Sequence, residues 1–487
     1  MCTIVLLFSL MSNGQIYFNL SGKINKKISP ELPVGSEVTL TKIKYDKDAG
    51  YHKIYFKCNG KSYYSYHRDL KKITFEANNI EEFWVKEALN KGVYDNLMKK
   101  GMQYKLRKEL EEEAIEYVKY TSSNNLLFGD SYLESYLYSL AYKLYPAKLN
   151  DGRPGILNVK IIKDVEPNAF IYANGTMFIS TGLLSTINSE EELIAAMAHE
   201  IAHFVLDHSI ININKAEQRK KRAEFWAGIA TGVAFAADLY TASNNPYYTP
   251  GLLTLGTATI AYSVAEEFNT RMGLKYSREQ EEEADACAKN VLNYIGVDHT
   301  SLSSVLAKIK TYNKINGNYI ALTGSGTHPS IKKRIEAIGK PKKEFTDIEY
   351  DKTISFVNSF NAAVQLNNLH LEACSLLVDR NIKAGIATEE DYVILAMVTT
   401  FMFDNPKKNF EALGYITKAK SLNVYPTINL HKQEAIIFIR LKKYDSAKAS
   451  LKIYLNSISE LIEKENNDYL IKEEKWTRKM IFKVGKM

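Results

Sequence analysis

Cysteine is scarce in this chain of 487 residues, and its four cysteines show no paired spacing. Cys2, Cys58, Cys287 and Cys374 are far apart, so no Cys-x-x-Cys pair is present. A chain of this length can bury a hydrophobic core without covalent cross-links. The spacing therefore predicts no disulfide framework, and we interpret Cys287 as a small buried hydrophobic residue.

A strong excess of one charge is also lacking. The chain has 63 basic and 56 acidic residues, which gives a net charge of +7. The two clear basic runs, Arg219–Arg222 and Lys340–Lys343, are short, and we interpret them as a solvated helix face and a linker. Hydrophobic residues make up 45% and charged residues 24%, as in ordinary globular proteins. We expect several domains and no binding of nucleic acid.

Long hydrophobic runs are absent as well. The most apolar internal segments, 225–240 and 252–265, have 16 residues or fewer, whereas a membrane-spanning helix needs about 20. Asp238 interrupts the first of them. We interpret both as buried or lid helices beside a cleft, and contact with a membrane surface is the less favoured alternative.

The N-terminus resembles an export signal. Thr3–Met11 is apolar and is followed by the small residues Ser12 and Gly14, as in a signal peptide cleaved before Gln15. The positive charge that usually precedes the apolar run is missing, since no Lys or Arg occurs before Lys23. We predict a signal peptide at 1–14 and export to the periplasm or cell envelope. The alternatives are a buried first strand and a cytoplasmic or membrane-associated protein.

Alternating apolar residues predict a small β domain at 15–79. Val38 and Leu40 alternate with polar neighbours, and Asn59-Gly60 between two such runs is a hairpin signal. Many short strands in so short a segment are typical of a barrel similar to bacterial SH3-like domains. The following segment, 80–122, is rich in Glu, Lys, Leu and Ala and predicts exposed linking helices.

The C-terminal segment, 346–487, predicts a helical domain. A stretch from Tyr392 through Ala412 to Ala419 aligns with a later one, Leu430–Tyr454, at a spacing of about 35 residues. This period is close to that of tetratricopeptide repeats, so the domain is predicted to be TPR-like and to offer a surface for protein partners. A plain helical bundle is an equally good interpretation.

The central segment, 123–345, has mixed periodicity. It predicts a helix followed by a strand at Ile156–Ile162, and then two strands, Ala169–Ala173 and Thr176–Ser180, joined by an Asn-Gly turn. Helices follow. We therefore expect a mainly α, multidomain protein whose central unit is an α+β core with a small sheet.

The sequence HEIAH lies in one of these helices. Ser189 and Glu192 form a capping-box pattern, and the segment from Leu193 to Leu206 is otherwise almost wholly apolar. Burying His199, Glu200 and His203 without partners would be very costly. The two histidines are four residues apart, hence on one helix face, and can bind zinc with Glu200 as general base. We predict one zinc ion per chain.

The third protein ligand must come from elsewhere. A metzincin pattern would need Gly at 206 and His at 209, and this chain has Leu206 and Ser209. His208 would point about 140° away from His203 if the helix continued, so we do not predict it to be a ligand.

A second acidic helix, Ser277–Leu292, offers the missing carboxylate. Glu281 and Asp285 share the face of Ala288 and Leu292, whereas the other acidic residues fall on faces that look solvated. We therefore predict Glu281 as the third ligand and Asp285 behind it, accepting a hydrogen bond from a ligand imidazole. The alternative is an acidic first turn that complements the helix dipole, which leaves an inward Asp285 unexplained.

His328 is a further candidate. It precedes Pro329 at the expected start of a helix that ends near Gly339. On spacing alone, a surface histidine is the better interpretation.

Together these motifs resemble metallopeptidase family forty-eight, which includes the HtpX heat-shock proteases and the CAAX prenyl endopeptidases. The likeness covers about 123–345. Its motifs in this sequence are Asn168-Ala169-Phe170 through Phe178, Gly182-Leu183-Leu184, HEIAH with His208, Glu281 with Asp285, and His328-Pro329 with Arg334. The branch most similar is the periplasmic β-barrel-assembly-enhancing proteases, which have C-terminal helical repeats. The N-terminal β domain departs from that branch.

The resemblance implies a zincin-like core, zinc proteolysis of polypeptides, and a catalytic role for His328 near the metal. We expect a zinc metalloendopeptidase that acts on misfolded or unassembled envelope proteins. The strand Thr176–Ser180 is predicted to pair with the extended substrate backbone. The alternative is a chaperone-like or scaffold protein that binds partners through the barrel and repeats and uses zinc structurally.

Overall fold

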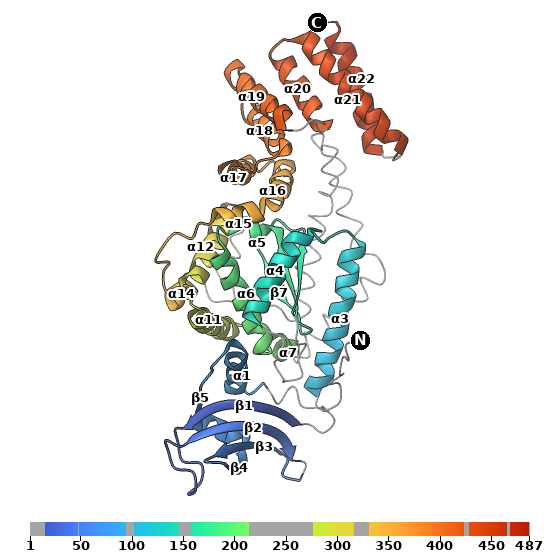
Figure 1. The fold of residues 1–487 in the computed structure, drawn as a ribbon. Coiled ribbons are helices and arrows are strands. Elements are labelled where there is room, and N and C mark those ends of the chain that lie inside the picture. Colours follow the sequence, from blue (N-terminus) through green and yellow to red (C-terminus); the bar gives the residue numbers. More distant parts are fainter. Residues whose placement is uncertain are drawn as a thin grey trace, which may run out of the picture.

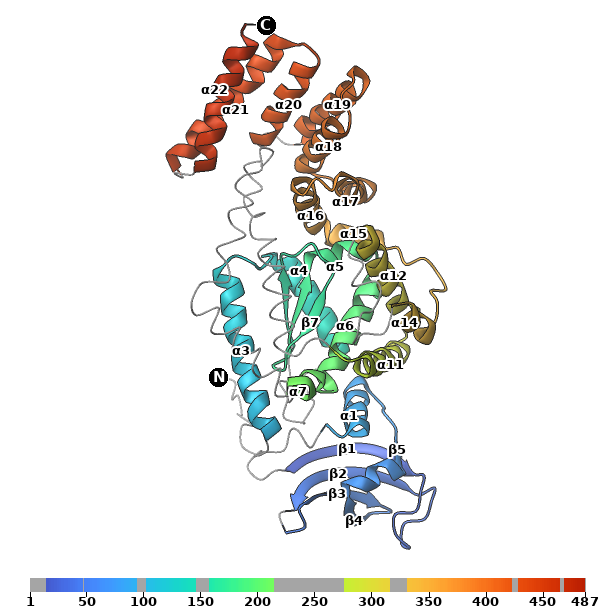
Figure 2. The same cartoon turned by 180° about the vertical axis from the view of Figure 1, so that it is seen from behind.

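The computed structural model describes residues 15–46, 48–93, 102–145, 157–213, 276–315, 331–422, 428–464 and 468–486. These residues are mostly helical, with a strand-rich unit at the N-terminal end and a second, small sheet near the middle (Figure 1). The molecule is elongated, and the C-terminal helices extend away from the central unit at the end opposite the N-terminal strands (Figure 2).

The N-terminal unit is a five-stranded sheet of order β4-β3-β2-β1-β5, in which all neighbours are antiparallel. One face packs on a short 3-10 helix and on the helix that follows. Asn59 and Gly60 both have positive φ, as a two-residue hairpin turn of the predicted kind requires. The elements are β1 (Gln15–Ile24), β2 (Glu37–Asp46), β3 (Tyr51–Cys58), β4 (Lys61–Tyr66), η1 (His67–Lys72) and β5 (Ile73–Phe75).

Two helices, α1 (Ile80–Lys91) and α3 (Met102–Ser123), occupy the segment predicted to be an exposed linker. They are instead partly buried, because their aromatic residues complete the core of the central unit. Phe83 and Trp84 are buried in that core, and the Trp84 indole N–H donates to the carbonyl of Leu144 at 2.7 Å. Helix α1 therefore attaches the N-terminal sheet firmly to the rest of the molecule.

The central unit is built on a three-stranded sheet of order β6-β8-β7. Strand β8 is parallel to β6 and antiparallel to β7, so it lies in the middle and every one of its residues is buried. One sheet face packs on α4 and α6, and the other packs on α3. The elements are α4 (Ser131–Leu144), β6 (Asn158–Ile162), β7 (Ala169–Ile171), β8 (Thr176–Ser180), α5 (Thr181–Thr186), α6 (Glu190–Val205), α7 (His208–Ile213), α11 (Arg278–Tyr294), α12 (Thr300–Ile315) and α14 (Ile331–Ile338).

The C-terminal part is helical, as predicted, and helices adjacent in sequence pack against one another. Small residues, among them Ala412, Ala419 and Ala447, are fully buried where the helices approach closely. The tetratricopeptide-like repeat and the SH3-like barrel both stay predictions. The elements are α15 (Ile348–Thr353), α16 (Ser355–Asn367), α17 (Leu371–Lys383), α18 (Glu389–Met402), α19 (Pro406–Leu422), α20 (Ile428–Arg440), α21 (Tyr444–Lys464) and α22 (Asp468–Val484).

Among the helices that the structure describes, none combines the length and the apolar character needed to cross a lipid bilayer. The predicted signal peptide at 1–14 and the apolar segments 225–240 and 252–265 lie outside the described residues.

Candidate metal centre

Helix α6 carries the HEIAH sequence and buries it almost completely. The Ser189 hydroxyl caps its start by accepting from the N–H of Glu192 at 3.3 Å. The Glu192 carboxylate accepts from the N–H of Asn188 at 2.6 Å, and not from Ser189 as the predicted capping box requires. It also pairs with Lys308 of α12 at 2.7 Å. The start of α6 is thus fixed against α12.

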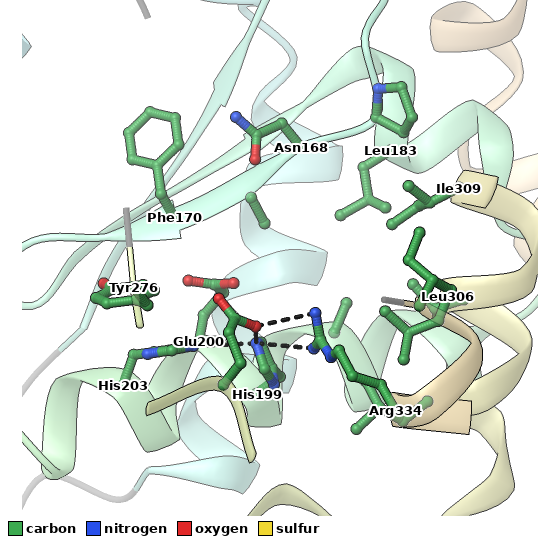
Figure 3. Close-up of a pocket in the computed structure, with 17 residues that line it drawn as sticks. Asn168, Phe170, Leu183, His199, Glu200, His203, Tyr276, Leu306, Ile309 and Arg334 are labelled. Atoms are coloured by element: carbon green, nitrogen blue, oxygen red, sulfur yellow. Dashed lines mark hydrogen bonds and ion pairs between the residues drawn. The ribbon is translucent and has the colours of Figure 1, made fainter. Parts of the chain in front are cut away.

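Three potential ligands converge beside this helix, and Figure 3 shows two of them, His199 and His203. The Nε2 atoms of His199 and His203 lie 3.0 Å apart, and Oε2 of Glu281, on α11, lies 3.5 Å from Nε2 of His199. All three side chains are buried, and their ligating atoms lie within 4.8 Å of one another. Helix α11 can supply Glu281 because Ser277 and Gln280 form a reciprocal capping box that fixes its first turn.

The geometry of these atoms fits a zinc ion. Tetrahedral zinc with ligands at about 2.0–2.2 Å places its ligand atoms about 3.3 Å apart, close to the spacings of 3.0 and 3.5 Å found here. Two imidazoles and one carboxylate are also a donor set that catalytic zinc uses, with the fourth position left open. The residues present therefore suit zinc.

Each imidazole has a partner behind it. Asp285 Oδ1 lies 3.0 Å from Nδ1 of His199. Nδ1 of His203 lies 2.8 Å from Nδ1 of His208, whose Nε2 lies 3.1 Å from the Glu283 carboxylate. Since Glu283 can only accept, His208 donates to it from Nε2 and accepts the Nδ1–H of His203. The imidazole of His203 then presents a bare Nε2 toward the metal position.

His203 is held in its neutral state by its surroundings. Burial lowers its pKa well below the ordinary value, and the neighbouring His199 adds to this effect. The ring of Tyr276 stacks on it with centroids 3.6 Å apart and planes inclined by 14°. A metal ion binds the neutral form of imidazole, and stacking on Tyr276 holds the His203 ring in a fixed orientation.

His208 lies close to the metal centre because α6 ends earlier than the apolar pattern suggests. The helix stops at Val205, and Asp207 has a φ of +57°, so the chain turns before α7 begins at His208. The carboxylate of Asp207 forms a buried ion pair with Arg107 of α3. The prediction assumed a continuous helix, and that assumption is wrong. His208 is not among the potential ligands but contacts one of them directly.

Arg334, on α14, connects the two carboxylates of α11. Its Nη1 lies 2.9 Å from Glu281 Oε2, and its Nε and Nη2 each donate to Asp285 at 2.7 Å. Helical periodicity does not predict these contacts, because Arg334 and its partners are about 50 residues apart in the chain. The family motif that contains Arg334 was the available signal.

Glu200 faces the same cavity. Burial raises its pKa to about 8; His199 and Arg334 act to lower it, and the nearby Glu281 to raise it further. Its Oε2 atom is buried and makes no hydrogen bond with any of the described residues. A partnerless carboxylate oxygen beside three converging ligands is placed to contact a small molecule that enters the cavity.

The cavity has a volume of about 280 Å³ and three distinct walls. The metal-site residues form one wall, and Asn168, Ala169 and Phe170, at the outer strand β7, form the second. The third is apolar and consists of Leu183, Ala196, Leu302, Val305, Leu306 and Ile309 (Figure 3).

The structure thus brings together five of the six predicted site residues, namely His199, Glu200, His203, Glu281 and Asp285. The sixth, His328, lies outside the described residues. The carboxylates that helical phase predicted to point inward are the buried ones, whereas Glu282 is exposed.

Comparison with known proteins agrees with this geometry. A model of peptidase family M48 matches residues 133–342. The chain carries a peptidase family M48 domain. The resemblance inferred from the motifs is confirmed, and the domain includes every residue of the metal centre described above.

The chain is also similar to several named proteins. The chain is 27% identical over 243 residues to mitochondrial metalloendopeptidase OMA1 of Schizosaccharomyces pombe, covering 48% of this chain and 63% of that protein. It is 28% identical over 193 residues to the putative beta-barrel assembly-enhancing protease of Vibrio cholerae and 25% identical over 194 residues to the beta-barrel assembly-enhancing protease of Escherichia coli. These two matches each cover 40% of this chain and 36% of the relative. The chain therefore spans less than two thirds of each.

Proposed function

We propose that this chain is a zinc-dependent metalloendopeptidase in which His199, His203 and Glu281 hold one ion. The observation that supports this most directly is the convergence of three buried ligating atoms beside the partnerless carboxylate of Glu200. The names of the relatives, which are metalloendopeptidases and proteases, support the same reaction class.

In this proposal Glu200 is the general base. A bound zinc ion supplies a Lewis acid that lowers the pKa of water and polarises the scissile carbonyl. Glu200 takes the proton from the attacking water and delivers it to the leaving amine. Its buried position suits this role, because a carboxylate whose pKa is raised toward neutrality can both accept and return a proton. His328 stays a prediction as a second catalytic residue.

The surrounding residues are proposed to position the ligands. Asp285, whose Oδ1 lies 3.0 Å from Nδ1 of His199, and His208, which accepts the Nδ1 proton of His203, are proposed to orient the two imidazoles. Arg334 balances the charge of Glu281 and Asp285, which would otherwise repel each other in a buried site. The site therefore needs partners from α6, α7, α11 and α14.

The substrate is proposed to be an extended polypeptide. The prediction that strand Thr176–Ser180 pairs with it is wrong, because β8 has β6 and β7 on its two sides and no free edge. Among the described strands, β7 lies at one edge of the sheet and borders the cavity, so we propose that it takes this role. The apolar wall favours a large apolar side chain next to the cleaved bond.

We further propose that the natural substrates are misfolded or unassembled envelope proteins and that the protein is exported. The names of the bacterial relatives and the signal-like N-terminal sequence support this.

The test of the peptidase activity is whether purified protein binds one zinc ion per chain and cleaves casein in a zinc-dependent manner. Stoichiometric zinc without cleavage would favour the scaffold alternative, in which the ion is structural.

The His208→Phe substitution is expected to weaken zinc binding by about 10- to 100-fold. Phenylalanine keeps the ring volume but cannot accept the Nδ1 proton of His203, so the ligand tautomer is no longer fixed. Zinc affinity is measured by competition with a chelator. His299→Phe is the matched control, since His299 is hydrogen-bonded to Asn293 and is not part of the metal centre. Wild-type affinity in His208→Phe would contradict the positioning role.

Zinc affinity is expected to rise with pH. Burial alone would lower the pKa of His199, but its hydrogen bonds to Asp285 and Glu281 outweigh this and raise the pKa to about 9 in the metal-free protein. Below that pH, zinc must displace a proton from His199. The dissociation constant for zinc is therefore expected to fall about tenfold for each unit by which the pH rises above 7, and to level off near pH 9. Asp285→Asn should move the plateau to lower pH. Isothermal titration in buffers of different protonation enthalpy measures the released proton. A pH-independent affinity would contradict the expectation.

A further inference from the structure

Lysine and tyrosine alternate on the outward face of the N-terminal sheet. Cross-strand pairing places Tyr17, Lys42, Tyr55 and Tyr64 side by side in one row across β1 to β4. The neighbouring row on the same face contains Lys44, Lys53 and Tyr66. Lys57 also lies on this face, two residues beyond Tyr55 along β3. These eight residues are called the lysine–tyrosine face.

The lysine–tyrosine face exposes far more aromatic surface than the interior side of the same strands. Tyr17 is 50% exposed and Tyr64 is 62% exposed, whereas Leu40, Ile54 and Phe56 on the inner side are at most 1% exposed. The inner residues form the core with η1 and α1. A group of exposed tyrosines that the fold does not need for its own core is typical of a binding surface.

The charge of this face favours an anionic partner. Lys53 is paired with Asp46 at 2.5 Å. Within the described part of the chain, Lys42, Lys44 and Lys57 form no ion pair with a carboxylate. The face therefore offers positive charge that its own residues do not neutralise.

The arrangement of the rings favours carboxylates over stacked bases. The ammonium group of Lys42 lies 4.4 Å from the centre of the Tyr55 ring, and that of Lys53 lies 5.1 Å from the centre of the Tyr64 ring. Tyr55 and Tyr64 also tilt against each other by 40°. Lysines thus cover one face of the Tyr55 ring and one face of the Tyr64 ring, where nucleic-acid bases would otherwise stack. The groups left to contact a partner are ammonium and phenol hydroxyls, which donate hydrogen bonds to carboxylates.

The sheet is fixed to the peptidase domain. Besides the buried Phe83 and Trp84 of α1, Lys91 at the end of that helix contacts Glu283 of α11 with its Nζ 2.6 Å from Oε1. Figures 1 and 2 both show the sheet at the end of the molecule next to α1 and α11. A polypeptide bound on the face would therefore stay attached to the same rigid body as the metal centre.

We propose that the lysine–tyrosine face is a docking site for acidic segments of unfolded polypeptides, separate from the cavity where cleavage takes place. The proposal rests on the proposed function in that its partner is the substrate of the peptidase. Docking at a second site raises the local concentration of substrate near the metal centre, so acidic substrates are captured at lower concentration without a change in the chemical step.

Binding is tested in the full-length, zinc-loaded protein with Glu200→Gln, so that the probe is not cleaved. The probe is a fluorescein-labelled, unstructured peptide with Glu at alternate positions, and its counterpart has Gln at the same positions. Anisotropy should show tighter binding of the Glu peptide. Replacing Lys42, Lys44 and Lys57 together with glutamine should weaken that binding by about tenfold.

The matched control replaces Lys26, Lys27 and Lys71 with glutamine, because these exposed lysines lie in the same unit outside its strands. It changes the net charge equally and should leave the affinity within about twofold. Equal weakening by both triple variants, equal binding of the two peptides, or tighter binding of a single-stranded oligonucleotide or an acidic oligosaccharide would each overturn the proposal.

The same lysine variant in the otherwise wild-type enzyme separates this proposal from the proposed function. It should raise KM for an acidic unfolded substrate and leave kcat for a short neutral peptide unchanged. Cleavage that does not respond to the lysine variant would refute the docking site and retain the peptidase. Peptide binding without any cleavage by the wild-type protein would refute the peptidase and retain the binding surface.

Discussion

The Glu200→Gln substitution is expected to lower kcat for casein cleavage by about 10²- to 10⁴-fold while zinc remains bound. Glutamine has the same shape but cannot accept a proton from water. None of the three ligating atoms belongs to residue 200, so the metal centre is left intact. Burial raises the pKa of Glu200 in the metal-free protein, and the positive charge of a bound zinc ion would lower that pKa and favour the carboxylate form that accepts the proton.

Three measurements are needed for this variant, namely the cleavage rate, the zinc content and the thermal unfolding temperature. Glu191→Gln is the matched control, because Glu191 lies on the same helix and points to the surface, where it pairs with Lys343. That control should cleave at the wild-type rate. If Glu200→Gln with a full complement of zinc cleaved as fast as the wild type, another residue would have to act as the base.

The Glu281→Gln substitution is expected to lower zinc affinity by more than about 100-fold. That is the largest loss expected from replacing a residue that only contacts a ligand, whereas Glu281 is itself the proposed ligand. The change removes an anionic ligand and leaves a neutral amide against the Arg334 guanidinium, which loses one of its two carboxylate partners. Removing one partner of a buried charged pair is strongly unfavourable. Competition with a chelator measures the dissociation constant.

Three substitutions on the same helix give a ranked test. Zinc affinity should fall most in Glu281→Gln, by an intermediate amount in Asp285→Asn and hardly at all in Glu282→Gln, whose side chain is exposed. All three remove one carboxylate from α11, so the overall charge change is the same. A larger loss in Asp285→Asn than in Glu281→Gln would mean that the ligand and the residue behind it are exchanged.

The sequence was sufficient to predict those parts of the site that depend on helical phase. Within the acidic cluster, Glu281 and Asp285 share a helix face with the apolar Ala288 and Leu292, which predicts that they point inward, and both are buried in the structure. The Asn59-Gly60 turn was equally predictable, since its backbone requires residues that tolerate positive φ. In each case the information lies within a few neighbouring residues.

The missed features depend on contacts that are distant in sequence or on a single irregular residue. The break at Asp207 carries no Gly or Pro, although Asp tolerates its left-handed backbone better than most residues do. The central place of β8 depends on pairing with β6, and its unbroken apolar run Met177–Ile179 was the available signal for a strand buried on both faces. The ion pairs of Arg334 had no local signal.

The ligands of the metal centre come from two helices, α6 and α11, and almost 80 residues of chain lie between His203 and Glu281. A zinc ion held by both would therefore act as a reversible cross-link, closing a long loop much as a disulfide bond does. Loss of the ion would remove that cross-link between the two helices. Bound zinc would then affect the unfolding of the peptidase domain as well as the proposed cleavage. If the protein cleaves unfolded polypeptides, as proposed, its own unfolded, metal-free form becomes a potential substrate.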